Sequence, residues 1–119
     1  MLADCNKFKC SKDMKRFACH RLYLSSTNYI DKAVVEVDEQ GYYTNGFPLT
    51  AEIDHTVWLG GIIVLSPLTQ LPAADWAGMT LADCLQLFCR PALKLIAWHI
   101  DTIDWKSMQL NPTTTIRRI

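Results

Sequence analysis

Hydrophobic and polar residues alternate along much of this chain with the two-residue period that is typical of β-strands. Residues 17–24 have apolar character on both faces, and residues 33–38 (AVVEVD) are rich in β-branched side chains. A Ser-Ser-Thr-Asn turn follows the first segment, so the two are expected to pair as a hairpin. Further strands are expected at residues 42–47, 56–59, 62–66, 93–100 and 113–119. The segment 62–66 (IIVLS) is apolar throughout, which predicts burial on both faces.

One segment has helical spacing instead. Leu81, Leu85 and Phe88 lie on one face of a helix, and Thr80 is a suitable N-cap before them. Pro91 prevents a straight continuation. The pattern therefore predicts a mainly β fold with one α-helix near residues 81–89.

Length and charge define the organisation of the chain. The 119 residues, half of them hydrophobic, suit one domain. The net charge is zero, but basic residues crowd the N-terminal segment, which lacks any period. We therefore expect a flexible basic arm over residues 1–15 and a single β domain over 16–119, with Met1 or Met14 as the native start.

The same features restrict the partners. Phe8 is the only aromatic residue among the early lysines and no nucleic-acid motif accompanies them, so nucleic acid is an unlikely partner. No apolar run approaches the roughly 20 residues that a membrane-spanning helix needs. We expect a soluble, cytoplasmic protein with no membrane contact.

Cysteine and histidine supply the candidate metal ligands: Cys19, His20, His55 and His99. The five cysteines follow neither a zinc pattern nor a disulfide framework and are expected to be reduced. Cys19 and His20 are neighbours in a strand, where they would point to opposite faces. His20 and His99 lie in apolar strands, which favours histidines at the edge of the core. No cofactor, metal site or catalytic residue is therefore predicted.

The four tryptophans divide into two groups. Trp58 and Trp98 lie in apolar strands and are expected in the core, while Trp76 and Trp105 lie in loop-like surroundings. Trp76 and Trp105 are the candidate interface residues, because aromatic side chains outside the core often mark contact surfaces.

Several segments together resemble a known family. They are RLYLSSTNYIDKAVVEVDEQG and WLGGIIVLSP in the leading half, then MTLADCLQLFCRPA, LKLIAWHID and NPTTTIRRI in the trailing half. They resemble the small composite β domain that flanks the catalytic barrel in the amidohydrolase superfamily, metal-dependent hydrolases such as cytosine deaminases and imidazolonepropionases. The resemblance implies a β-sandwich-like domain built from halves 16–67 and 79–119 and joined by a short linker. The barrel is absent, and no His-x-His metal motif follows Gly61.

Three functions follow from these observations. The first is a non-catalytic domain that acts through self-association or protein partners, because loss of the barrel would expose apolar surface. The alternative is a divergent metal-dependent hydrolase, or a subunit that completes the hydrolase site of another chain. The third is a module that binds an anion through the basic arm together with Arg117 and Arg118.

Overall fold

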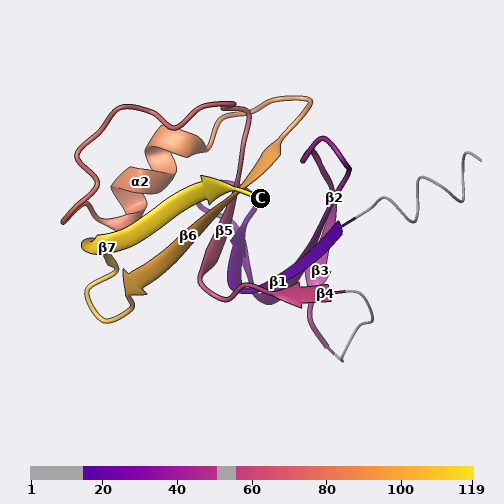
Figure 1. The fold of residues 1–119 in the computed structure, drawn as a ribbon, viewed down its shortest axis with the longest axis horizontal. Helices are drawn as coiled ribbons and strands as arrows, with labels where there is room; N and C mark the ends of the chain where they lie inside the picture. The colour runs from indigo at the N-terminus through magenta and orange to yellow at the C-terminus, as the bar shows by residue number, and fades with distance from the viewer. Residues whose placement is uncertain (1–14, 51–55) are drawn as a thin grey trace, which may run out of the picture.

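The computed structural model describes residues 15–50 and 56–119, which form seven β-strands and one α-helix (Figure 1). The elements are β1 (Lys15–Tyr23), β2 (Tyr29–Val37), β3 (Tyr43–Pro48), β4 (Thr56–Trp58), β5 (Ile62–Ser66), α2 (Leu81–Phe88), β6 (Ile96–Asp104) and β7 (Gln109–Arg118). The predicted mainly β fold with one helix near residues 81–89 is confirmed. Lys15, which the sequence placed in the basic arm, begins β1. The rest of the predicted arm lies outside the described residues.

All seven strands belong to one sheet, with the order β3-β2-β1-β5-β6-β7 and with β4 paired to β1. The two halves of the predicted composite domain are joined where β5 pairs antiparallel with β6, through partners such as Val64 and Trp98. The halves are thus continuous in one sheet instead of forming two separate sheets. Tyr42 bridges to Ile96, and the Tyr43 N–H donates to the Leu95 carbonyl at 2.7 Å. The sheet therefore curls until the start of β3 meets the start of β6.

The central strand β5 is buried on both faces, as its apolar sequence predicted. Ile62 and Val64 pack in one core cluster with α2, whereas Ile63 and Leu65 pack in a second cluster inside the curl of the sheet. Figure 1 shows α2 on the side of β6 and β7, with β1 to β4 on the other side of β5. The two-residue period of β5 thus separates the two cores.

The helix α2 begins at the predicted cap. The Thr80 hydroxyl accepts a hydrogen bond from the Asp83 N–H at 3.2 Å, which satisfies one of the free donors of the first turn. Leu81, Leu85 and Phe88 are buried with Cys84, so the helix packs one apolar face on the sheet.

A diglycine corner between β4 and β5 positions the candidate site. One edge of β1 pairs in parallel first with β4 and then with β5. At the change of partner the Gly61 carbonyl accepts hydrogen bonds from the N–H groups of His20 (3.0 Å) and Arg21 (3.3 Å). Gly60 and Gly61 have φ of +70° and +58°, a region that side-chain-bearing residues rarely adopt. The corner therefore requires glycines and fixes the course of β1 at His20 and Arg21.

Candidate functional site: an aromatic and basic hollow beside the diglycine corner

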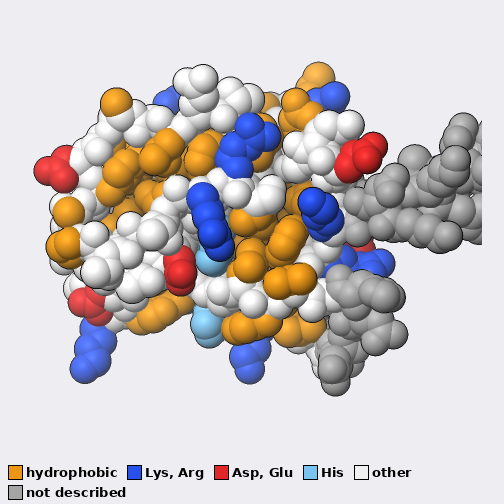
Figure 2. Space-filling view, viewed as in Figure 1, with side chains coloured by type: hydrophobic (Ala, Val, Ile, Leu, Met, Phe, Trp, Pro, Cys, Tyr) orange, Lys and Arg blue, Asp and Glu red, His pale blue; other side chains and the backbone are white. Residues whose placement is uncertain are grey.

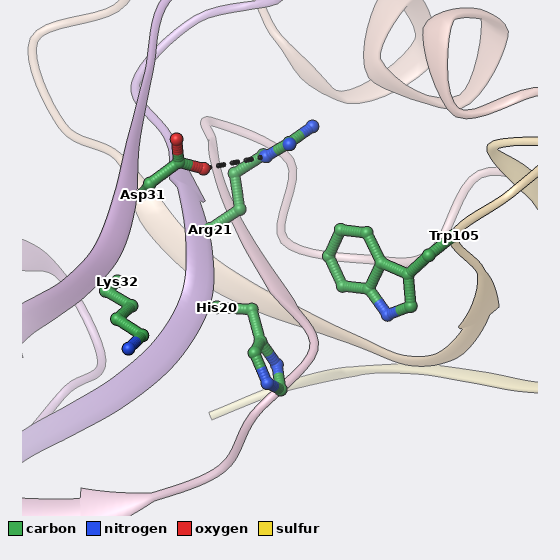
Figure 3. Close-up of a pocket in the computed structure, with 5 residues that line it drawn as sticks. All are labelled: His20, Arg21, Asp31, Lys32 and Trp105. Atoms are coloured by element: carbon green, nitrogen blue, oxygen red, sulfur yellow. Dashed lines mark hydrogen bonds and ion pairs between the residues drawn. The ribbon is translucent and has the colours of Figure 1, made fainter.

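An open hollow of about 630 Å³ lies where β1, β2 and the turn after β6 come together (Figure 3). His20 and Arg21 from β1, Asp31 and Lys32 from β2, and Trp105 from the turn line it. Arg21 and Asp31 are directly opposed in the β1–β2 register. The hairpin therefore places a cation and an anion side by side, and the β6–β7 turn adds the aromatic ring.

Arg21 is held by aromatic rings on several sides. Its guanidinium carbon lies 4.2 Å from the centre of the Tyr29 ring, 5.6 Å from that of Trp105 and 6.0 Å from that of Tyr23. Nη1 donates to the Tyr23 hydroxyl at 3.1 Å, and Nε donates to Asp31 at 3.3 Å. Cation–π contacts of this kind orient a guanidinium as well as stabilising it. Partial burial opposes the charge, but the hydrogen bond to Tyr23 helps to raise the pKa of Arg21 overall, so the group stays charged.

His20 lies between two tryptophans. Its ring makes edge contacts with Trp58, at 5.0 Å between ring centres, and with Trp105 at 5.8 Å. The His20 Nδ1 accepts a hydrogen bond from the Gly61 N–H at 2.9 Å, which fixes Nδ1 as the unprotonated nitrogen. His20 thus links the diglycine corner to the two exposed indoles.

His99 contacts the same corner from β6. It is only 2% exposed, and its Nε2 lies 3.1 Å from the Gly60 carbonyl oxygen. Because a carbonyl can only accept, Nε2 must carry the proton. The other nitrogen, Nδ1, is buried without a hydrogen-bond partner. Burial lowers the pKa of His99, so the ring is neutral near pH 7.

The candidate metal ligands that the structure describes, Cys19, His20 and His99, do not form a metal site. Cys19 is buried inside the curl of the sheet and His20 is exposed, so the two neighbours point to opposite faces as predicted. Burial raises the pKa of Cys19 to about 12. His55 lies outside the described residues. Within residues 15–50 and 56–119, no three His, Cys, Asp or Glu side chains come together as a metal site.

The tryptophans differ partly from expectation. Trp98 is buried as predicted, and its Nε1 donates to the Leu68 carbonyl at 3.0 Å. Trp58, predicted in the core, is 52% exposed, so that prediction is wrong. The cause is the shortness of β4, which pairs with β1 at the margin of the sheet. Trp76 stacks on Phe88 at 5.8 Å and is partly buried, whereas Trp105 is 41% exposed and lines the hollow.

Sequence reasoning missed Arg21, Asp31 and Lys32 as site residues. Asp31 and Lys32 are adjacent charged residues that lie just before the predicted strand 33–38. In the structure β2 begins earlier, at Tyr29, and this brings Asp31 opposite Arg21. On the face seen in Figure 2, Lys, Arg and His side chains lie among hydrophobic ones.

Comparison of the chain with protein-family models, characterised proteins and solved structures finds no match. Among the described residues, no helix combines the length and apolar character that crossing a membrane requires. The geometry of the hollow and of the exposed aromatic residues is therefore the basis for a functional proposal.

Proposed function

We propose that this chain is a non-catalytic β domain that acts through protein contacts, with self-association as the first form of contact. The observation that supports this most directly is the exposure of Val57 (54%) and Trp58 (52%), neighbouring residues of β4. Neighbours in a strand point to opposite faces, so β4 presents apolar side chains on both of its sides.

Trp105 extends this surface, because it and Trp58 contact the same His20 ring. We use the name aromatic surface for Trp58 and Trp105 beside His20 together with Val57 on the other side of β4. Exposed tryptophans are enriched among the residues that dominate binding energies at protein interfaces. The net charge of zero means that two copies do not repel each other at long range. In this proposal the domain descends from the small domain of an amidohydrolase, acts in the cytoplasm and carries out no hydrolysis itself.

Light scattering on the purified chain at micromolar concentrations tests self-association. We expect twice the monomer mass for the wild type and the monomer mass for Trp58→Ser. Leu93→Ser is the matched control, because Leu93 is a fully exposed apolar residue outside the aromatic surface and its removal should leave the mass unchanged. A strict monomer at every concentration would contradict self-association.

A crosslinking experiment separates a second copy from a different partner. A photoreactive residue replacing Val57 in cells should give either an adduct of the chain with itself or one defined partner adduct, and the same residue at Leu93 should give neither. Absence of any adduct specific to position 57 would overturn protein contact as the function.

A further inference from the structure

The hollow has a composition that the protein-contact proposal does not use. The aromatic surface needs only Val57, Trp58 and Trp105, whereas the hollow adds Arg21 and Lys32 at its walls. Its volume of about 630 Å³ lies within the range of roughly 300–1,000 Å³ that is typical of small-molecule sites. It is therefore large enough for a small ligand, independently of any protein partner.

Arg21 has unused hydrogen-bonding capacity in a fixed orientation. Its side chain is 22% exposed and is held by the Tyr23 hydroxyl and the Tyr29 ring. Of the five guanidinium N–H donors, those on Nη2 have no hydrogen-bond partner among residues 15–50 and 56–119. Figure 3 shows the terminal nitrogens pointing away from Asp31. A pre-oriented guanidinium with free donors is suited to a carboxylate or a phosphate.

The charges around Arg21 favour an anion over a cation. Lys32 supplies a second exposed cation, and Asp31 is engaged at Nε, on the side of the guanidinium opposite its terminal nitrogens. A cationic ligand would normally bind over the faces of aromatic rings. The guanidinium of Arg21 already lies over one face of the Tyr29 ring and one face of the Trp105 ring. The carboxylate of Asp31 is 71% exposed, so water screens its repulsion of a bound anion.

Trp105 supplies a surface for the rest of the ligand. Trp105 is 41% exposed and lines the hollow, and its ring contacts both Arg21 and His20. Planar rings stack on such a surface in offset or edge-on geometry. An anionic group and a flat ring would thus bind to neighbouring side chains at the same time.

We propose that the hollow binds a small organic anion that carries a planar ring, with its carboxylate or phosphate on the Nη2 donors of Arg21 and its ring against Trp105. Lys32 adds long-range attraction for the anion. The hollow lies within a single chain, so the ligand does not require self-association. Trp105 also belongs to the aromatic surface, however, so binding is measured at concentrations at which the chain is monomeric.

Five probes test this with the full chain by calorimetry and by NMR of the indole N–H signals. Benzoate and phenyl phosphate carry both a ring and a charge, benzyl alcohol carries only the ring, and acetate and inorganic phosphate carry only the charge. We expect one or both ring-bearing anions to bind at least about tenfold more tightly than the three partial probes, because each partial probe can make either the charged hydrogen bond or the stacking interaction but not both. The better of benzoate and phenyl phosphate identifies the anionic group.

Variants locate the binding. Arg21→Gln should weaken the better ring-bearing anion about tenfold, and Trp105→Ala should reduce its affinity to that of the matching anion without a ring, acetate or inorganic phosphate. Lys94→Gln is the matched control, because Lys94 is another exposed cation that lies over an aromatic ring, 5.0 Å from the centre of Tyr42, but outside the hollow. It should bind as the wild type does.

Thermal unfolding shows whether each variant is folded. If Arg21→Gln does not fold, Arg21→Lys replaces it, since it keeps one charge but loses the planar set of donors. Wild-type protein that binds neither ring-bearing anion, or that binds them no better than the partial probes, would overturn the proposal. The proposal would also be overturned if the folded Arg21 and Trp105 variants bound the ring-bearing anion as tightly as the wild type does. The Trp58→Ser variant distinguishes the two proposals, because it should lose self-association and keep anion binding.

Discussion

His20 and His99 hold two successive glycines from opposite directions. The His20 Nδ1 accepts from the Gly61 N–H at 2.9 Å, and the His99 Nε2 donates to the Gly60 carbonyl at 3.1 Å. The two histidines come from β1 and β6, which are separated in the sheet by β5. Because one peptide group links the glycines, the histidines together fix the corner at which β1 changes its partner from β4 to β5.

This arrangement predicts that Gly61 cannot be replaced. A Cβ at Gly61 would lie 2.5 Å from the Ile100 carbonyl oxygen and 3.2 Å from His99 Nε2, at a φ of +58°. We expect Gly61→Ala to lower the free energy of unfolding by at least about 3 kcal/mol, from backbone strain plus displacement of β6. Urea unfolding measures this.

Gly78→Ala is the control for the strain alone. Gly78 has a φ of +81°, but a Cβ there would meet no atom within 4 Å. Its cost should be only about 1–2 kcal/mol. Equal effects of the two substitutions would mean that the close approach of β6 to Gly61 is unimportant.

Acid should destabilise the fold through His99. Burial lowers the pKa of this ring below its ordinary value of 6.5, which the unfolded chain retains. Below pH 6.5 the unfolded state therefore takes up a proton that the folded state does not, and stability falls as the pH falls. One proton gives at most about 1.4 kcal/mol per pH unit.

Urea unfolding between pH 7.5 and 5.5 measures this slope, a window above the ordinary pKa of carboxylates. His99→Gln should flatten the slope, while His20→Gln should retain the His99 contribution. The same slope in wild type and in His99→Gln would show that another group is responsible.

Local pattern was sufficient to predict most elements of this fold. The apolar run of β5, and the N-cap and apolar face of α2, are signals carried by residues close together in the sequence. Both elements lie where the sequence predicted them. The bounds of β6 and β7 were less accurate, because β6 has a positive φ at Thr102 and the β6–β7 ladder shifts register there. Pro112 lies in β7 where that ladder is interrupted. Proline has no N–H donor, so it is tolerated where no ladder hydrogen bond is needed.

The candidate site could be predicted only in part. The Arg21–Asp31 pair follows from the hairpin register, and that register could be inferred from the turn between β1 and β2. The exposure of Trp58 and the approach of Trp105 to His20 depend on the order of the strands in the sheet. The alternation of apolar and polar residues predicts strands, but it does not show which strands lie next to each other. The meeting of His20 and His99 at one corner depends on the same order.

The cap of α2 gives a local test of stability. Because the Thr80 hydroxyl accepts from the Asp83 N–H, Thr80→Ala should lower the free energy of unfolding by about 1 kcal/mol. Thr80→Ser keeps the hydroxyl and should lose much less. Urea unfolding compares the two, and a Ser variant as unstable as the Ala variant would show that the cap is not the cause.

The described cysteines should differ in reactivity according to their burial. Burial raises the pKa of Cys19 and Cys84 to about 12 and that of the half-buried Cys89 to about 11. Since the thiolate is the reactive form, the native protein at pH 8 should be alkylated at Cys89 before Cys19 or Cys84. In urea the three should react at similar rates, which peptide mapping by mass spectrometry can resolve. Rapid native labelling of Cys19 would instead show that the curl of the sheet opens at β1, because Cys19 lies inside it.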